Sequence, residues 1–163
     1  MPPAGRARPR YAPARRRPGR IVVLASRFNE NVTRRLLAGA EQCLRERGVA
    51  ASRVDVVWVA GAWELPVVAR AFAARGAHAV VALGAVIRGE TRHFEIIADE
   101  SARGLMAVAV TYGVPVGFGV LTCDTLEQAL ARSGGAAGNK GFEAAAAALD
   151  AAAARAGPGA DSR

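Results

Sequence analysis

The sequence predicts a three-layer α/β/α sandwich built on a four-stranded parallel sheet. Short apolar runs alternate with amphipathic helical stretches, and this alternation is typical of parallel strands joined by right-handed crossovers. The runs are apolar at almost every position, as strands are when helices cover both faces of their sheet. The length of 163 residues suits one domain with a sizeable core.

The strands and helices can be placed in order from Ile21 onward. The first apolar run is followed by a stretch in which Val32, Leu36 and Ala40 recur at helical spacing. The same alternation repeats three more times, and an alanine-rich helix ends the domain. Glycines such as Gly48 follow helix ends. We expect strands at residues 21–25, 54–59, 79–87 and 114–121, and helices at residues 29–47, 64–75, 93–112, 125–132 and 140–155.

Helix caps and turn residues complete this outline. Asn29 or Asn31 can cap the first helix, and Asp124 can cap the fourth. Residues 134–138 (GGAAG) predict a flexible joint before the last helix. The order of the elements favours a flavodoxin-like strand order in one domain that spans residues 21–156.

The positive charge of the chain is concentrated in its first 20 residues. The formal net charge is +8, and residues 1–20 contain seven arginines and no acidic residue. Residues 21–163 contain the other 15 basic residues and all 14 acidic ones, so the net charge of the folded part is close to zero. We expect a disordered Arg/Pro-rich tail at residues 1–20 and a disordered C-terminus at residues 157–163. A solvated tail is favoured over a polyanion-binding arm, and nucleic acid is not an expected partner.

Nothing in the sequence predicts a membrane protein. Residues 1–20 lack the apolar central run of a signal peptide. The long uncharged stretch at residues 104–123 is interrupted by Gly113, Pro115 and Gly117, which predict a helix end, a turn and a strand rather than a membrane span. Cys43 and Cys123 have no metal-binding spacing and suit reduced thiols. A cytoplasmic location is therefore expected.

The strand ends predict where a ligand binds. In an open parallel sheet, ligands bind beyond the carboxyl ends of the strands. Aromatic, acidic, basic and hydroxyl side chains follow all four predicted strands, whereas the opposite edge carries short glycine-containing returns. The candidate segments are residues 26–29, 60–64, 88–93 and 122–125.

The third of these segments has the features of an anion site. Gly89 permits a tight turn, and the backbone N–H groups of Glu90, Thr91 and Arg92 then precede a helix. A helix N-terminus of this kind suits a phosphate. His93 lies at the positive end of the helix dipole, which favours a neutral imidazole that can accept a proton.

Five blocks of sequence, in this order along the chain, resemble the lumazine synthase family. The longest, residues 84–94 (GAVIRGETRHF), contains the predicted anion site, and the resemblance extends from Ile21 to Ala154. The other blocks are residues 27–30, 61–66, 118–122 and 138–141. Members of this family condense 5-amino-6-(D-ribitylamino)uracil with 3,4-dihydroxy-2-butanone 4-phosphate to form 6,7-dimethyl-8-ribityllumazine. The resemblance therefore implies a transferase of riboflavin biosynthesis that uses neither a metal nor an organic cofactor.

The resemblance also implies a role for each matching residue. His93 is the expected catalytic residue, which moves protons during imine formation and phosphate loss. Phe118 and Arg132 are expected to come from an adjacent subunit. The expected uracil and ribityl site comprises Phe28, Ala62, Trp63, Glu64, Ala85, Val86, Ile87 and Phe118, and the expected phosphate site comprises Glu90, Thr91, Arg132 and Lys140.

Three features depart from the pattern of the family. Glu90 stands where many members have Ala or Gly, so we expect only its backbone N–H to contact the phosphate while its carboxylate turns to solvent, Arg88 or Arg92. Ala136 stands where many members have lysine, which removes one positive charge near the phosphate. The proline-rich tail replaces a short N-terminal strand that many members add to the sheet of a neighbour.

The resemblance implies a homo-oligomer whose sites lie at subunit interfaces. A cyclic pentamer is the basic unit of the family, and some members build icosahedral shells from pentamers. Both assemblies remain open here, and riboflavin synthase is a further candidate partner besides the small-molecule substrates. The alternative function is a non-catalytic lumazine- or flavin-binding protein, or a shell-forming structural protein, of the same fold.

Overall fold

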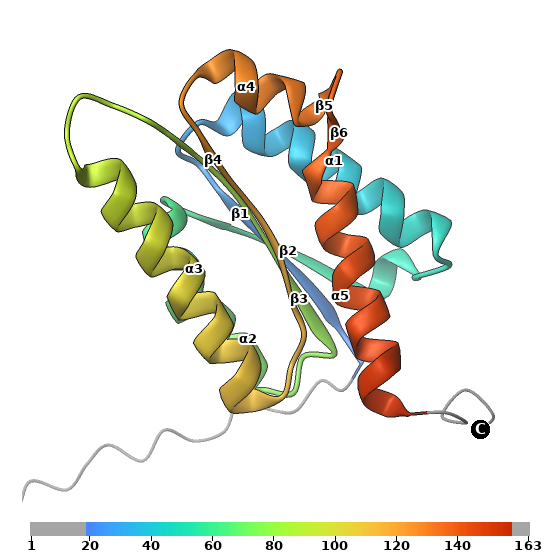
Figure 1. Ribbon diagram of the computed structural model, residues 1–163. Helices are drawn as coiled ribbons and strands as arrows, with labels where there is room; N and C mark the ends of the chain where they lie inside the picture. Colours follow the sequence, from blue (N-terminus) through green and yellow to red (C-terminus); the bar gives the residue numbers. More distant parts are fainter. Residues whose placement is uncertain (1–18, 158–163) are drawn as a thin grey trace, which may run out of the picture.

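The computed structural model describes residues 19–157, which form a sheet between two layers of helices (Figure 1). The four strands of the sheet are parallel and lie in the order β2-β1-β3-β4. This order confirms the predicted flavodoxin-like arrangement. The strands are β1 (Ile21–Ser26), β2 (Val54–Val59), β3 (Ala79–Ile87) and β4 (Val116–Cys123).

Helices cover both faces of the sheet, which confirms the three-layer sandwich. One face packs against α1 (Glu30–Glu46), α4 (Leu126–Ala131) and α5 (Lys140–Ala156), and the other against α2 (Leu65–Ala74) and α3 (His93–Tyr112) (Figure 1). Two short 3₁₀ helices precede β2 and α2, namely η1 (Ala51–Arg53) and η2 (Ala62–Glu64). No helix within residues 19–157 is long and apolar enough to cross a membrane.

The central strand β1 shows why the apolar runs are continuous. All six of its residues are buried. Ile21 and Val23 belong to the core beside α1 and α5, whereas Val22 and Leu24 belong to the core beside α2 and α3. Side chains alternate between the two faces of a strand, so a strand covered on both faces needs apolar residues at odd and even positions alike.

Glycines allow α5 to lie unusually close to its neighbours. A Cβ atom on Gly117 of β4 would lie 2.1 Å from the Ala144 carbonyl oxygen, and one on Gly119 would lie 3.1 Å from the Ala144 Cβ atom. On α5 itself, a Cβ atom on Gly141 would lie 1.9 Å from the Leu36 carbonyl oxygen of α1. The small residues at these positions therefore set the depth at which α5 packs.

Replacing Gly141 by alanine is expected to destabilise the protein by about 1–3 kcal/mol, because α1 and α5 must move apart to admit the methyl group. The free energy of unfolding, measured in a denaturant titration of both proteins, checks this. Ala151→Leu adds more volume at an exposed position of α5 and should change the free energy by about 0.5 kcal/mol or less. Equal effects of the two substitutions would contradict the close-packing argument.

Three local predictions are corrected. The predicted flexible joint at residues 134–138 is an antiparallel hairpin of β5 (Ser133–Gly135) and β6 (Gly138–Asn139), in which Gly134 and Gly138 supply the positive φ angles. Asn29 precedes α1 but makes no capping hydrogen bond with its side chain. The fourth helix is capped by Thr125, whose hydroxyl accepts from Gln128 N at 3.3 Å, and not by Asp124.

The ordered domain begins before Ile21. Arg20, which the sequence assigned to the tail, pairs with Asp55 on β2 and donates to the Ser52 carbonyl at 2.8 Å. Arg53 in turn donates to the Gly19 carbonyl. The rest of the predicted tail and almost all of the predicted disordered C-terminus lie outside the described residues.

Candidate active site

A cavity of about 460 Å³ opens at the carboxyl edge of the sheet, where the sequence predicts a ligand. It brings together nine of the predicted site residues, which come from the ends of β1, β2 and β3 and from the start of α3. These are Phe28, Ala62, Trp63, Glu64, Ala85, Val86, Ile87, Thr91 and His93. Ala60, Gly61 and Gly89, from the candidate segments after β2 and β3, also line it, and Phe94 and Ile97 of α3, which lie outside those segments, complete the lining.

Phe28 and Trp63 make the rim of the cavity aromatic. Phe28 is 73% exposed and Trp63 is 55% exposed, which is unusual for side chains of this size in the described part of the chain. Phe28 is held in place by its backbone N–H, which donates to the Ala60 carbonyl at 3.0 Å. Two exposed aromatic side chains beside an apolar cavity can sandwich or stack on a planar ring.

Asn29 fixes the turn that presents Phe28, and the sequence argument missed this role. Its φ angle is 58°, so it lies in the left-handed region, which asparagine tolerates better than most residues. Its side-chain Nδ2 donates to the Ala85 carbonyl at 2.8 Å. An asparagine three residues beyond a strand end is the available signal, but the sequence pattern favours a helix cap at that position.

Glu64 lies in the η2 turn between β2 and α2. One of its carboxylate oxygens accepts from the backbone N–H of Gly61 at 2.9 Å, which fixes the side chain beside the cavity. An ionised carboxylate has about four acceptor positions on its two oxygens, so Glu64 keeps the capacity to accept from the hydroxyl groups of a ligand. Ala62, in the same turn, is buried and also lines the cavity.

The start of α3 has the features of the predicted anion site. The helix begins at His93 and is 20 residues long, and Arg92, which precedes it, makes no capping hydrogen bond with its side chain. The backbone N–H of His93 donates to Thr91 Oγ1 at 3.4 Å, so a hydroxyl group is also present at this end of the helix. Uncapped N–H groups at a helix N-terminus are available to an anion.

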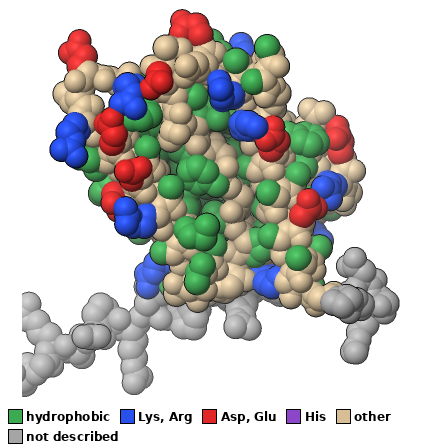
Figure 2. All heavy atoms as spheres, in the orientation of Figure 1, with side chains coloured by type: hydrophobic (Ala, Val, Ile, Leu, Met, Phe, Trp, Pro, Cys, Tyr) green, Lys and Arg blue, Asp and Glu red, His purple; other side chains and the backbone are tan. Residues whose placement is uncertain are grey.

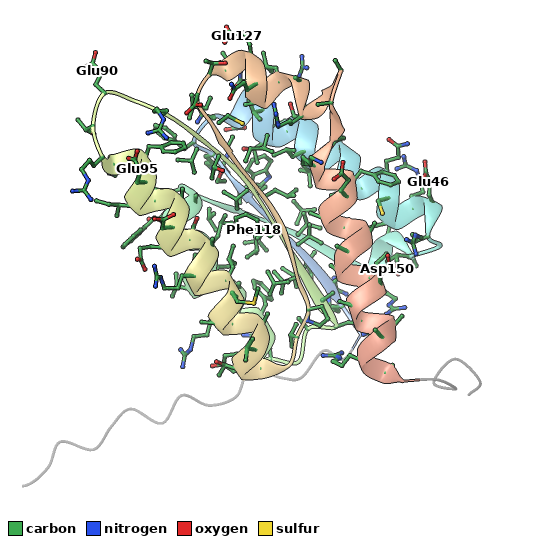
Figure 3. The ribbon with its side chains drawn as sticks, in the orientation of Figure 1. Glu46, Glu90, Glu95, Phe118, Glu127 and Asp150 are labelled. Atoms are coloured by element: carbon green, nitrogen blue, oxygen red, sulfur yellow. The ribbon has the colours of Figure 1, made fainter. Side chains whose placement is uncertain are left out.

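The Glu90 side chain points away from the cavity. Figure 3 shows it projecting from the tip of the loop between β3 and α3. It is exposed and does not line the cavity. Arg88, one of its expected partners, instead pairs with Glu95 and Asp124. No part of Glu90 lines the cavity of its own chain, and the contact expected between its backbone N–H and a phosphate stays a prediction.

Phe118, Arg132 and Lys140 do not line the cavity of their own chain. Phe118 is 47% exposed on β4, where it borders a smaller hollow of about 250 Å³ beside Met106 of α3. Figure 2 shows hydrophobic side chains gathered on this face of the molecule, over β4 and between α3 and α5. Arg132 donates to the Gln128 carbonyl at 3.1 Å, and Lys140 pairs with Glu143 at 2.6 Å. The cavity of a single chain thus brings together most of the residues predicted to bind the uracil and ribityl groups but only part of the predicted phosphate site.

Comparison with known proteins agrees with the geometry of this edge. The family model for 6,7-dimethyl-8-ribityllumazine synthase matches residues 18–156. A protein of that name from Gemmatimonas aurantiaca is 59% identical over 132 residues, which cover 80% of each chain. A second protein of that name, from Kosmotoga olearia, is 49% identical over 132 residues, which cover 80% of this chain and 85% of the relative. The chain therefore belongs to the 6,7-dimethyl-8-ribityllumazine synthase family.

Proposed function

We propose that this protein condenses 5-amino-6-(D-ribitylamino)uracil with 3,4-dihydroxy-2-butanone 4-phosphate to give 6,7-dimethyl-8-ribityllumazine, with loss of water and phosphate. One observation carries this proposal. A single cavity joins an aromatic rim to a helix N-terminus that bears a histidine. The two parts suit a planar heterocycle and a phosphate, and holding two reactants together in one site supplies a large share of the rate enhancement.

Different residues of the cavity bind the pyrimidinedione ring and the ribityl chain of the uracil substrate. Phe28 stacks on the pyrimidinedione ring, whose edge meets the backbone of residues 85–87. The carbonyl of Ala85 already accepts from Asn29, so the backbone groups of Val86 and Ile87 are the better placed to bind the ring. Ala62, Trp63 and Glu64 line the path of the ribityl chain, and the Glu64 carboxylate accepts from its hydroxyl groups.

His93 handles the protons of the reaction. The 5-amino group of the uracil attacks the ketone carbonyl, and water leaves to form an imine. A proton is then removed so that phosphate can leave, and the ribitylamino nitrogen attacks the carbonyl formed by that elimination, with loss of a second water, to close the ring. A histidine at the edge of the cavity can take and return these protons. The N–H groups at the start of α3 and the Thr91 hydroxyl stabilise the negative charge of the departing phosphate.

The phosphate site is completed across a subunit boundary. Arg132 and Lys140 lie outside the cavity of their own chain, and Phe118 is exposed on an edge strand, so all three suit the site of an adjacent subunit. An arginine fork binds a phosphate with two parallel hydrogen bonds. The proposed assembly is a homo-pentamer or an icosahedral shell of pentamers, and riboflavin synthase is a proposed partner that consumes the product.

Two assays on one sample of purified protein test the proposal. The two substrates are mixed with the protein, and lumazine is followed by its absorbance and fluorescence, while light scattering reports the size of the assembly. Formation of lumazine faster than in a protein-free mixture is expected. Tight binding of lumazine without acceleration would instead support the non-catalytic binding protein.

The proposed location is the cytoplasm. Cys43 and Cys123 are free and buried, and burial raises the pKa of both thiols, so both stay protonated and inert. Free thiols of this kind suit a reducing compartment.

Removing residues 2–17 is expected to leave lumazine formation within about twofold of the full-length protein, because a segment rich in arginine and proline contributes little to a packed core. The deletion stops short of Gly19 and Arg20, which contact the domain. Rates measured per site, together with light scattering, check this prediction. A loss of activity would show that the tail contributes to the site or to its assembly.

A further inference from the structure

Arg88, the first residue after β3, connects three parts of the active-site edge. Its Nε donates to Asp124 Oδ1 at 2.7 Å, its guanidinium group also pairs with Glu95, and its Cζ lies 4.3 Å from the centre of the Phe94 ring. Phe94 and Glu95 belong to the first turn of α3, whereas Asp124 directly follows β4. One side chain therefore links the end of β3, the start of α3 and the junction between β4 and α4.

The loop that Arg88 opens has little support along its length. Residues 88–92 are all exposed, and Glu90 at the tip projects into solvent (Figure 3). A Cβ atom on Gly89 would meet no atom within 4 Å. At the base of the loop, Arg88 N donates to the Cys123 carbonyl at 2.9 Å, and the Arg88 side chain adds the contacts to Glu95 and Asp124. The contacts of Arg88 are therefore well placed to restrain the loop.

The surroundings of Arg88 distinguish it from a phosphate ligand. An arginine beside a predicted anion site is by default a candidate to bind the anion, but this guanidinium group lies between two carboxylates of its own chain. The hydrogen bond from Arg88 is the main reason that the pKa of Glu95 is lowered, so Glu95 remains ionised at neutral pH. The carboxylates of Glu95 and Asp124 both pair with Arg88, so two of its donors are already used.

We propose that Arg88 is a positioning residue, which holds the N-terminus of α3 and His93 in the geometry that phosphate loss requires without itself binding the phosphate. This inference rests on the proposed function, because it names a residue that supports the proposed phosphate site. Arg88 contacts the first turn of α3. His93 is the first residue of that turn, and the N–H groups of the proposed phosphate site belong to it or directly precede it. A displacement of about 1 Å at such a position can lower a rate by about 100-fold.

Steady-state kinetics of a matched set of variants tests the proposal. Arg88→Met keeps the apolar stem and removes the fork, and Arg88→Lys keeps the charge. Asp124→Asn removes the negative charge that Arg88 faces and changes the shape of the side chain very little. Arg103→Met is the control, because Arg103 is an exposed arginine on α3 that pairs with Glu100 at 3.5 Å. Rates are measured on the assembled protein, with each substrate varied in turn.

We expect kcat to fall by about tenfold or more in Arg88→Met. A similar fall is expected in Arg88→Lys, since an ammonium group cannot reproduce the planar fork. Asp124→Asn should also lower kcat, and adding it to Arg88→Met should cost little more, because both act through one contact. Arg103→Met should keep its activity. A higher KM for the phosphate substrate alone, restored by Arg88→Lys, would identify Arg88 as a phosphate ligand and overturn the proposal.

Hydrogen exchange separates this proposal from the proposed function. In Arg88→Met, the amides of residues 96–99, which donate to carbonyls of residues 92–95 in the first turn of α3, should exchange faster while protection of the sheet is unchanged. Loss of protection throughout the domain, or no change at residues 96–99, would overturn the positioning role. If the unmodified protein formed no lumazine, the proposed function would fail, whereas the exchange experiment would still test whether Arg88 holds the loop.

Discussion

Replacing His93 by alanine is expected to lower the turnover number for lumazine formation by at least about tenfold, the lower part of the range for losing a positioned acid–base group. His93 is the first residue of α3 and lines the cavity. Among residues 19–157, no other histidine lines this cavity. Binding of the uracil substrate should change little, because Phe28 and the η2 turn remain. Single-turnover rates and substrate titrations measure the two quantities separately.

The chain provides its own control for this experiment. His78, its only other histidine, lies just before β3 at the opposite edge of the sheet. Burial, followed by the charges of Arg155 and Arg53, lowers the pKa of His78, so it is neutral at neutral pH and its removal does not change the net charge. His78→Ala should therefore keep its turnover number. Unchanged turnover in His93→Ala would remove His93 from the mechanism.

Replacing Arg132 by alanine is expected to raise the KM for the butanone phosphate by roughly 10- to 100-fold, which corresponds to losing a hydrogen bond to a charged group of about 1.5–3 kcal/mol. The KM for the uracil substrate should change much less. Arg45→Ala, an exposed arginine on α1, serves as the charge-matched control. An effect confined to the uracil substrate would show that Arg132 does not bind the phosphate.

Mixed assemblies can show that Arg132 acts across a subunit boundary. His93→Ala and Arg132→Ala chains are unfolded together in equal amounts and reassembled. If Arg132 serves the neighbouring site, about a quarter of the interfaces combine an intact His93 with an intact Arg132, and activity returns in that proportion. If both residues act within one chain, no mixed assembly contains a complete site and activity stays low.

Most of the fold could be predicted because it depends on local patterns. Apolar runs and helical spacing identify every strand of the main sheet, and parallel pairing then places the cavity at the correct edge. The hairpin at residues 133–139 was missed because its strands are made mainly of glycine, which carries no apolar signal. A glycine-rich run has the same composition in a tight hairpin as in a flexible joint.

The contacts that shape the site were harder to predict because they join distant residues. Asn29 donates to a carbonyl 56 residues away, and Arg88 pairs with a carboxylate 36 residues away. Sequence patterns placed each of these side chains at the correct edge of the sheet. They could not select one partner among several polar groups there, because that choice depends on backbone positions set by the whole fold.

Residues 117–119 of β4 alternate between the packed interior of this protein and its surface. Gly117 and Gly119 face α5, so Phe118 between them faces the α3 side and is partly exposed. Successive residues of a strand point to opposite faces. A shift of one position along β4 would direct the aromatic ring into α5 and leave bare backbone on the outer surface. Helix packing and the exposure of Phe118 thus cannot change independently. If Phe118 contacts a neighbouring subunit as proposed, a variant selected for altered assembly through it would have to keep both flanking glycines.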